Sequence, residues 1–442
     1  MAIKPELPGG FRDYLPPTQQ KRIDILVTLE KLAEIYGFQP LGTPSIEKKK
    51  ILTGADPEFE KELIEIERPK NKESWALRFD QTVSLSRAVA KHPQEIEMPF
   101  KRYQFGKVWR GEKPQKGRYR EFYQFDVDIV STSRITSEAE IISFIYESLK
   151  KLGIDDFKIF ISSRKVLDGL PGLAGFDPEI NPSVLRSIDK LDKKDWVSVE
   201  KELSKKGLDS DQISHIKEFL DIQSESVEEY LGTVKDFMKD QTDVIEGVEE
   251  LEQLVEYLSL LEVEKSNFEI DFSIARGLDY YTGPVFETVL ENSGVGSIFS
   301  GGRYDDLIER FSSTPVPSVG ASLGVDRLVD ALSGMDKSEM DFGSRPSVLV
   351  LDFDEDCTKD CLEFVSKLRK EGIDSQVYLG QENSLTGQLS YGASREFRVV
   401  VIYGSDEKEK GVVQLRDMDE ESQIEVAEDE LVSAIKNILT EN

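Results

Sequence analysis

Cysteine and histidine are scarce in this sequence, whose 442 residues contain two of each. Cys357 and Cys361 lie four residues apart in a segment of helical character, so they cannot form a framework of disulfides. His92 and His215 are too few and too isolated for a typical His/Cys metal site, and we interpret them as surface or capping residues. These scarcities exclude a disulfide-stabilised scaffold and a structural zinc protein.

Long apolar runs are also missing. No window approaches 18 uninterrupted apolar residues, as a membrane-spanning helix would require, and the opening MAIKPELPGG lacks the apolar core of a secretion signal. With 38% hydrophobic and 32% charged residues, the composition is typical of a soluble globular protein. We therefore expect a cytoplasmic protein without a membrane partner, and the length predicts two or three domains.

Positive charge is in deficit overall, with 56 Lys+Arg against 85 Asp+Glu and a formal net charge of -29. Such a surface repels phosphate, so we do not expect DNA as a partner. One stretch departs from this balance, because residues 98–124 contain eight basic side chains and two acidic ones. The basic residues are Lys101, Arg102, Lys107, Arg110, Lys113, Lys116, Arg118 and Arg120. A local basic strip of this kind can hold a polyanion at one place while the rest of the surface repels it.

The pattern along the chain predicts an α+β protein with an interrupted domain. Strand-like and helical segments alternate in residues 1–163 and again in 261–332, which we assign to one interrupted, β-rich domain. Residues 164–260 are rich in Lys, Glu and Leu at helical spacing and predict a helical insertion. A polar linker with glycine and proline breakers covers 333–346, and the alternating β and α segments of 347–442 predict a small α/β domain.

The basic strip has the pattern of a long hairpin, in which GEKPQKG joins FKRYQFGKVWR to RYREFYQFDVDIV. Arg110 closes the first arm, and Arg118 and Arg120 open the second. Side chains two apart on a strand share a face, so we expect Arg118 and Arg120 to point the same way. Guanidinium groups suit bidentate capture of phosphate oxygens, so the hairpin predicts a phosphate site.

Two segments further along add candidate ligand contacts. IARGLDYYTG places Arg276 close to Tyr280 and Tyr281, and on a strand one tyrosine would face a pocket while the other packs. GASLGVDR places Gly320 and Gly324 where a strand meets a helix, leaving room for a flat group, with Arg327 in the first turn of the helix. Neither a P-loop nor a GxGxxG dinucleotide fingerprint is present.

Together these segments resemble a known enzyme family. An arginine that closes a strand before a charged hairpin, followed by Gly-x-x-x-Gly-x-x-Arg, resembles motifs 2 and 3 of class II aminoacyl-tRNA synthetases, and GFQPLGTPSIE resembles motif 1. LRFDQT, PQKGRYREFYQFDVDI, ARGLDYYTG and the opening LPGGFRDYLP are similar to the histidyl-tRNA synthetase family over nearly the full length. The resemblance implies that residues 1–163 and 261–332 form an antiparallel-sheet catalytic domain and that residues 347–442 form an anticodon-binding domain.

The resemblance also implies an activity and its partners. The expected enzyme is a ligase that activates L-histidine with ATP, in the presence of Mg²⁺, and transfers histidine to the 3' end of tRNA(His). A homodimer formed through the motif 1 region is implied as well. The C-terminal domain carries 11 basic and 22 acidic residues from Gly343 onward, so its expected role at the anticodon comes from the resemblance and not from its charge.

Site roles carry over to matching positions. The ATP phosphates are assigned to Arg110, Arg118, Arg276 and Arg327, with Arg110, Arg276 and Arg327 as catalytic residues. Histidine is assigned to Asp80, Gln81, Thr82, Gln124, Asp128, Tyr280 and Tyr281, of which the last three surround the imidazole ring. The hairpin tip, Gln115 and Lys116, is assigned to the tRNA acceptor end, and no protein side chain is assigned to a metal.

Position 128 departs from the family pattern, because many bacterial members have glutamate there. The shorter aspartate requires that a partner moves closer or that water bridges the gap.

Three alternatives differ from this interpretation. A synthetase-like paralogue acting as a histidine-binding regulatory subunit would bind histidine without forming an adenylate, but such regulators typically lack the arginines and the C-terminal domain. A synthetase for another amino acid would share motifs 2 and 3 but not RGLDYYTG. A plain nucleic-acid-binding module does not explain the arginines at 110, 276 and 327, which are far apart in the sequence.

Overall fold

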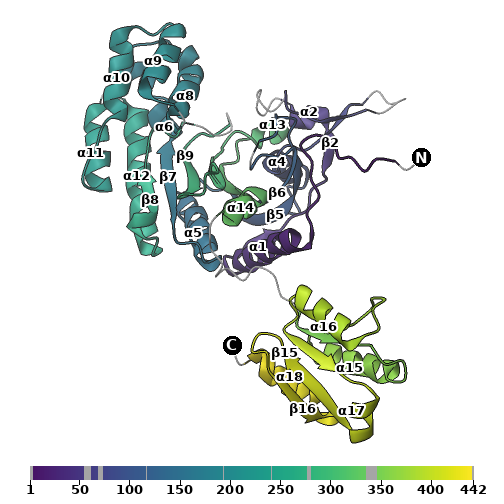
Figure 1. The fold of residues 1–442 in the computed structure, drawn as a ribbon. Helices are drawn as coiled ribbons and strands as arrows, with labels where there is room; N and C mark the ends of the chain where they lie inside the picture. The colour runs from purple at the N-terminus through teal and green to yellow at the C-terminus, as the bar shows by residue number, and fades with distance from the viewer. Residues whose placement is uncertain are drawn as a thin grey trace. The chain divides into compact units, whose positions relative to one another are not determined.

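The computed structural model describes residues 3–53, 61–67, 73–115, 117–192, 194–239, 241–275, 280–334 and 346–440. The chain divides into two compact units, Met1–Met340 and Asp341–Asn442 (Figure 1). Two expected site residues, Lys116 and Arg276, lie outside the described residues.

The first unit is built on a large sheet. Its strands are β1 (Gln39–Pro40), β5 (Phe100–Trp109), β6 (Glu121–Val130), β7 (Phe157–Ser163), β8 (Phe268–Ile270), β9 (Pro284–Leu290), β10 (Phe299–Arg303) and β11 (Ser318–Gly324). Among the described residues the sheet has eight strands in the order β1-β5-β6-β11-β10-β9-β7-β8. All neighbours from β5 to β7 pair antiparallel, and only the edge pairs β1/β5 and β7/β8 of this described sheet are parallel. The antiparallel sheet and the hairpin of β5 and β6 are therefore confirmed.

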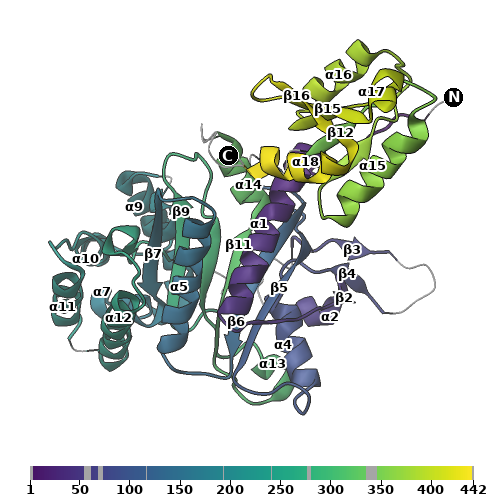
Figure 2. The same ribbon diagram turned by 90° about the horizontal axis from the view of Figure 1, so that it is seen from below.

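Helices cover one face of this sheet and leave the other for the site. The helices α1 (Pro16–Ile35), α5 (Thr136–Lys151) and α14 (Val325–Gly334) pack against β6, and Figure 2 shows α1 and α5 lying across the strands. Because side chains alternate along a strand, Phe125, Val127 and Ile129 of β6 point toward these helices. Phe125 accordingly stacks on Phe144 of α5, with ring centroids 6.4 Å apart. The even-numbered residues of β6 therefore face the other way.

Smaller elements flank the uncovered face. They are β2 (Ile46–Lys48), β3 (Glu65–Ile66), β4 (Trp75–Leu77), α2 (Lys49–Leu52), α4 (Thr82–Lys91) and α13 (Glu309–Ser312). The three short strands form an antiparallel sheet in the order β2-β4-β3. An apolar cluster of Leu52, Phe79, Val83, Tyr304 and Leu307 joins them to α4 and to the segment after β10. This packing fixes the start of α4 beside the sheet.

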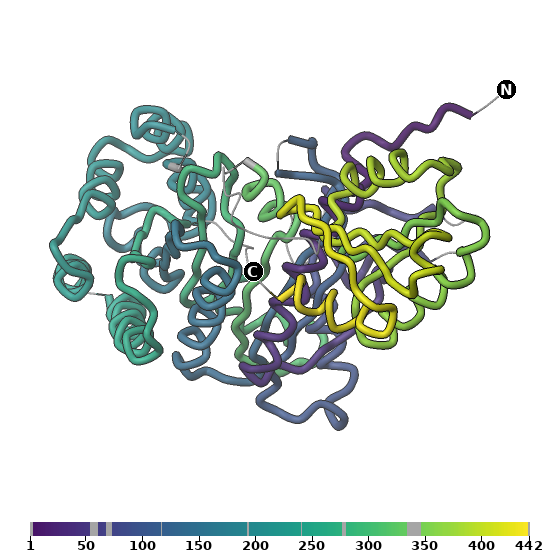
Figure 3. The backbone as a smooth tube through the Cα atoms, turned by 60° about the horizontal axis from the view of Figure 1, so that its bottom comes forward, coloured from purple at the N-terminus to yellow at the C-terminus, as the bar shows by residue number. Residues whose placement is uncertain are grey.

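A helical lobe is inserted between β7 and β8. Its elements are α6 (Arg164–Leu167), α7 (Leu170–Ala174), η1 (Pro178–Ile180), α8 (Asn181–Ile188), η2 (Asp189–Asp192), α9 (Trp196–Lys205), α10 (Ser210–Leu220), α11 (Val227–Phe237), α12 (Thr242–Leu260) and η3 (Lys265–Asn267). The long helix α12 buries Val244, Val248, Leu251, Leu254 and Leu258 at spacings of three and four residues, as expected for one face of a helix. It packs on α5, β7 and β9, which attaches the lobe, teal in Figure 3, to one side of the sheet.

The second unit is a small α/β domain. Its elements are β12 (Val348–Val350), α15 (Thr358–Lys370), β13 (Ser375–Val377), α16 (Leu385–Ser394), β14 (Val399–Ile402), α17 (Ser405–Lys410), β15 (Val412–Asp417), β16 (Gln423–Ala427), η4 (Glu428–Glu430) and α18 (Leu431–Thr440). The sheet order is β13-β12-β14-β15-β16, with parallel pairs on one side and antiparallel pairs on the other. The sequence did not predict α17, which consists of six polar residues with none buried, or β16, a short edge strand whose first three residues are exposed.

Both cysteines are buried free thiols of this second unit. Among the helices of the described residues, none combines the length and the apolar character needed to cross a bilayer.

Candidate active site

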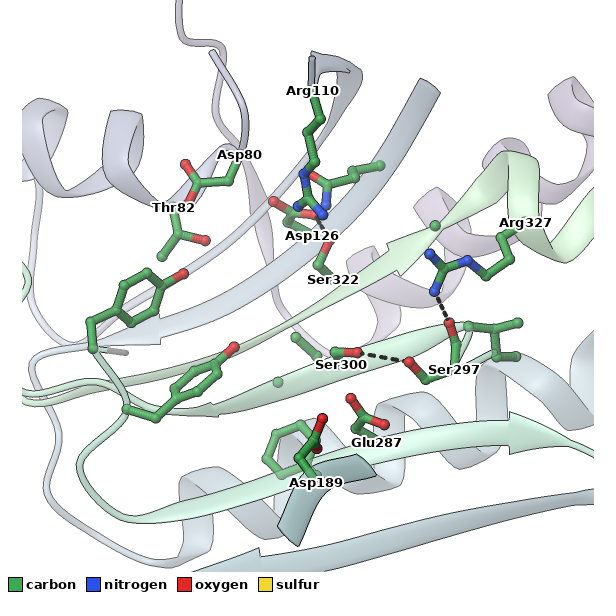
Figure 4. Close-up of a pocket in the computed structure, with 18 of the residues that line it drawn as sticks. Asp80, Thr82, Arg110, Asp126, Asp189, Glu287, Ser297, Ser300, Ser322 and Arg327 are labelled. Atoms are coloured by element: carbon green, nitrogen blue, oxygen red, sulfur yellow. Dashed lines mark hydrogen bonds between the residues drawn. The ribbon is translucent and has the colours of Figure 1, made fainter. Parts of the chain in front are cut away.

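A cavity of about 840 Å³ opens on the uncovered face of the large sheet. Its floor comes from β6, β9, β10 and β11, and its walls come from the start of α4, the hairpin loop, α14 and the helical lobe. In Figure 4, Asp80, Arg110, Asp126 and Arg327 point into this one cavity from four separate segments. Its volume suits a small polar ligand with a nucleotide attached.

Strand register places the floor residues in rows. Across β5, β6 and β11, one row reads Arg102, Asp128, Gly320, and the next reads Gln104, Asp126, Ser322. The second row continues through Ser300 of β10 to Glu287 of β9. Because members of a row lie directly opposite one another, their side chains meet on the same face of the sheet.

One end of the cavity is cationic. Arg110, at the end of β5, donates from Nε to the Phe79 carbonyl at 3.2 Å, and Arg327, in the first turn of α14, donates to the Gly117 carbonyl at 3.3 Å. Arg118 lines the same end and pairs with Glu112 at 3.3 Å. Burial, together with repulsion from Arg118 and Arg110, lowers the pKa of Arg327 to about 10. Because Arg110, Arg118 and Arg327 bring three positive charges to one end of the cavity, an anion bound there would relieve their mutual repulsion.

The middle of the cavity holds two buried carboxylates, Asp80 and Asp126. Burial raises the pKa of Asp80 to about 6 and that of Asp126 to about 7. Asp80 Oδ1 caps α4 by accepting from the Val83 amide at 3.2 Å, and Asp126 Oδ1 accepts from the Ser322 hydroxyl at 2.6 Å. The Oδ2 atom of each has no hydrogen-bond partner among the described residues. Each carboxylate therefore has one oxygen available for a ligand.

Asp128 is held from two sides. Its Oδ2 lies 2.6 Å from Nη2 of Arg102, which is fully buried directly across the strand pair, and its Oδ1 accepts from the Tyr304 hydroxyl at 2.5 Å. Gly320 lies on its other side, where a Cβ would collide with the carboxylate. Arg102 and Tyr304 therefore contact both oxygens of the shorter aspartate side chain directly.

The structure brings most of the expected site residues to this cavity. The lining includes Asp80, Thr82, Arg110, Arg118, Gln124, Asp128, Tyr280, Tyr281 and Arg327, as well as both glycines, Gly320 and Gly324. Gln81 is not part of the lining. Its side chain is fully buried and donates to the carbonyls of Gln104 and Gln124, because the turn before α4 directs it toward the sheet. Gln115 is likewise not among the lining residues but forms a tight turn with Arg118 at the hairpin tip.

Two expectations about side-chain direction are wrong because the residues are not on strands. Tyr280 and Tyr281 precede β9, and both line the cavity, with ring centroids 5.2 Å apart. Arg118 and Arg120 precede β6, so strand alternation does not apply to them. Arg118 lines the cavity, whereas Arg120 donates to the Gly9 carbonyl at 3.0 Å.

The basic strip is divided among several tasks and does not form one surface. Lys101 pairs with Glu140, Lys107 pairs with Glu121, and Arg102 is buried against Asp128. Only Arg110 and Arg118, among the strip residues that the structure describes, line the cavity. The expectation that the whole strip serves a polyanion is therefore too broad.

Several lining residues were not predicted. Asp126 could have been found, because it lies between Gln124 and Asp128 at the two-residue spacing of one strand face. Tyr304 lies in SGGRYDD, where the glycines drew attention and the tyrosine did not. For Glu287 on β9, no motif or spacing in the sequence indicates that it lines a cavity. The helical lobe contributes a further basic wall, formed by Arg164, Arg186, Lys190 and Lys206.

Comparisons with known proteins agree with this geometry. A family model described as "Histidyl-tRNA synthetase" matches residues 10–328, and one described as "Anticodon binding domain" matches residues 347–438. The chain is 37% identical to a histidine–tRNA ligase of Clostridium tetani, over 98% of this chain and 99% of that protein. It is 40% identical to a histidine–tRNA ligase of Wolinella succinogenes, over 94% of each.

Solved structures show the same architecture. The crystal structure of histidyl-tRNA synthetase from Nostoc sp. superposes with a TM-score of 0.86 at 31% identity, over 99% of this chain and 100% of that chain. A structure from Bacillus halodurans, described as an ATP phosphoribosyltransferase regulatory subunit/histidyl-tRNA synthetase, superposes with a TM-score of 0.77 over 92% of this chain and 100% of that chain. At 20% identity this second likeness concerns the fold alone. With both of its units matched and close relatives along nearly its whole length, the chain belongs to the histidyl-tRNA synthetase family.

Proposed function

We propose that this protein is a histidine–tRNA ligase whose activation chemistry takes place in the cavity of the large sheet. It joins L-histidine to ATP as histidyl-adenylate, releases pyrophosphate, and transfers histidine to the 3' end of tRNA(His). The observation that carries the proposal is the arrangement of the cavity, with three guanidinium groups at one end and buried carboxylates and tyrosines in the middle.

The cationic end suits the phosphates of ATP. During adenylate formation the α-phosphorus gains negative charge, and guanidinium groups held in place by the protein stabilise that charge without reorganising. We assign Arg110 to the α-phosphate and Arg327 to the γ-phosphate, with Arg118 beside them. Arg276 is proposed for the α-phosphate from its motif position alone. The histidine carboxylate is itself the nucleophile, so little acid–base chemistry is required.

The middle of the cavity suits histidine. Asp80 presents an oxygen to the ammonium group, with Thr82 and Gln124 nearby. For the imidazole ring we propose Tyr280, Tyr281 and the carboxylates of β6, where Asp126 has an oxygen available and Asp128 is oriented by Arg102. A site that pairs both ring nitrogens rejects apolar amino acids, because their binding would leave buried polar groups unpaired.

Mg²⁺ would enter with ATP. No group of three His, Cys, Asp or Glu side chains suited to a metal occurs in the described part of the chain. Glu287 faces the cavity and could hold one coordination position, and Mg²⁺ commonly takes its remaining ligands from phosphates and water. The ion would neutralise charge on the departing pyrophosphate.

Further partners and boundaries are also proposals. The hairpin tip with Gln115 and Lys116 is proposed for the tRNA acceptor end, and the second unit for the anticodon. Ile23 and Val27 of α1 and Phe105 of β5 are exposed apolar side chains, which supports a homodimer that covers them. We also propose a cytoplasmic location, no role for DNA, and the domain boundaries at 163/164, 260/261, 332/333 and 346/347.

Amino-acid-dependent ATP–pyrophosphate exchange against all twenty amino acids tests the function. Exchange with histidine alone is the expected result, followed by charging of tRNA(His) by the same protein. Exchange with another amino acid would overturn the assignment of the pocket. If none of the twenty amino acids supports exchange but calorimetry shows that histidine binds, the regulatory-subunit alternative would be supported.

A further inference from the structure

The N-terminal segment, residues 10–22, contacts two elements that carry ATP-site arginines. They are the hairpin loop, which carries Arg118, and α14, which carries Arg327. The Gly10 carbonyl accepts from the Arg120 amide at 2.9 Å, which joins the segment to the loop after Arg118. Arg22 and Arg12 join the same segment to Asp326 and Asp330 of α14. None of these N-terminal residues lines the cavity within the described structure.

The inner contact is a buried cluster of Arg22, Tyr123 and Asp326. Arg22 of α1 forms an ion pair with Asp326 Oδ1, and both side chains are almost fully buried. Asp326 Oδ2 accepts from the Tyr123 amide of β6 at 2.6 Å. Asp326 directly precedes Arg327, so this cluster fixes the first turn of α14 against the sheet.

The outer contact lies one helical turn further along α14 and involves Arg12, Tyr119 and Asp330. Arg12 donates to the Tyr119 hydroxyl at 2.7 Å and to Asp330 Oδ1 at 3.0 Å, and the Tyr119 hydroxyl donates to Asp330 Oδ2 at 2.7 Å. The three side chains thus close a triangle. Each pair of its members is held by a bond in which at least one partner is charged, which favours a fixed geometry.

Tyr14 connects the two clusters. The Arg12 guanidinium lies 4.2 Å from the centroid of the Tyr14 ring, and the Arg22 guanidinium lies 3.4 Å from it. Both cations therefore contact the same aromatic ring. The segment that contains Arg12 and Tyr14 links two ends of the site that are far apart in the sequence, namely the hairpin loop and α14.

We propose that Arg12 is a positioning residue for ATP, acting through Tyr119 and Asp330. It holds the hairpin loop, where Arg118 is the neighbour of Tyr119, at a fixed separation from α14, where Arg327 is anchored. The phosphate chain of ATP has to bridge these two arginines, so a change in their separation weakens ATP binding and leaves histidine binding unchanged. This inference rests on the proposed function, because it takes Arg118 and Arg327 as ATP contacts.

The test is the split between the two substrate KM values in pyrophosphate exchange, measured for Arg12→Met, Asp330→Asn and the double variant. We expect each single variant to raise the ATP KM about tenfold, equivalent to about 1.4 kcal/mol, while the histidine KM changes less than about twofold. The double variant should be no worse than the singles, because both remove the same triangle. Arg12→Lys, which keeps the charge but not the fork of donors, should fall between the wild type and Arg12→Met.

Arg398→Met provides a matched control. Arg398 is an arginine paired with two carboxylates, Asp417 at 2.9 Å and Asp419 at 2.6 Å, but it lies in the second unit. Because pyrophosphate exchange does not involve tRNA, this control should leave both KM values unchanged.

Three outcomes would overturn the positioning role. They are an equal rise in both KM values, additive effects in the double variant, and an ATP KM for Arg12→Met like that of the control. Calorimetric titration with ATP alone is run on the same proteins and should show about tenfold weaker binding for Arg12→Met. If the wild type shows no exchange, the proposed function fails, and this titration still decides the positioning role.

Discussion

Replacement of Asp128 by asparagine should destabilise the catalytic unit as well as impair histidine binding. Arg102 is fully buried, and its ion pair with Asp128 is the salt bridge that the described structure gives it. Removing one member of a buried pair leaves an uncompensated charge and costs about 3–5 kcal/mol. We expect a value of about 3 kcal/mol, at the lower end of this range, because loss of the Asp128 charge favours ionisation of Asp126 beside Arg102, which offsets part of the loss.

Asp126→Asn is the matched control. Asp126 lies two residues away on the same face of β6 and is equally buried, but it forms no salt bridge in the described structure. Its hydrogen bond from Ser322 can be kept by the asparagine oxygen. We therefore expect the free energy of unfolding to fall by less than about 1 kcal/mol at any pH, as for exchange of one hydrogen-bonding group for another. At neutral pH it should rise, because the asparagine replaces a carboxyl group whose ionisation burial disfavours.

Urea unfolding followed by tryptophan fluorescence measures this difference. The three tryptophans, Trp75, Trp109 and Trp196, all lie in the first unit, so the signal reports the unit that contains the ion pair. Asp128→Asn should also raise the histidine KM far more than the ATP KM. Equal losses of stability for the two variants would refute the reasoning from the buried pair, and equal effects on both KM values would remove Asp128 from the imidazole pocket.

Other perturbations test separate parts of the site. Arg110→Ala should abolish adenylate formation while calorimetric histidine binding persists, and normal exchange by this variant would refute its role at the α-phosphate. Gly320→Ala should destabilise the fold by about 1–3 kcal/mol through its collision with Asp128, whereas Gly324→Ala, where a Cβ has its nearest neighbour at 3.6 Å, should leave the Tm almost unchanged. Burial raises the folded-state pKa of Asp126 from its usual value of 3.8 to about 7, so its contribution to stability is present at low pH and is lost as the pH rises through about 7. Asp126→Asn should lack this decline in urea unfolding between pH 4 and pH 8, and an identical slope in both proteins would contradict the burial of a neutral acid.

The sequence predicted the architecture and most of the lining because those features depend on local patterns. Arg110 at a strand end and Arg327 at a helix start follow from periodicity and turn residues, and the structure places both in the cavity. The helical lobe followed from the spacing of its apolar residues.

Side-chain direction outside regular elements could not be predicted. Tyr281 and Arg120 precede strands, and Gln81 precedes a helix, so no period fixes their orientation. Arg102 was counted with a surface strip because its partner, Asp128, is 26 residues away and becomes its neighbour only through the register of β5 and β6. Tyr304 was missed for a similar reason, since it follows β10 and reaches Asp128 of β6 only because the sheet order brings these two strands to either side of β11.

The order of the strands has a consequence for the newly made chain. β6 is complete at Val130, but its partner β11 begins only at Ser318, beyond the whole helical lobe. At a synthesis rate of about 5–20 residues per second, the hairpin of β5 and β6 waits on the order of 10–40 seconds with an unpaired edge. Charges that point inward from an edge strand hinder pairing with other chains, and Asp126 and Asp128 lie on that edge. The carboxylates proposed to recognise histidine in the finished enzyme would thus also protect the nascent chain from aggregation.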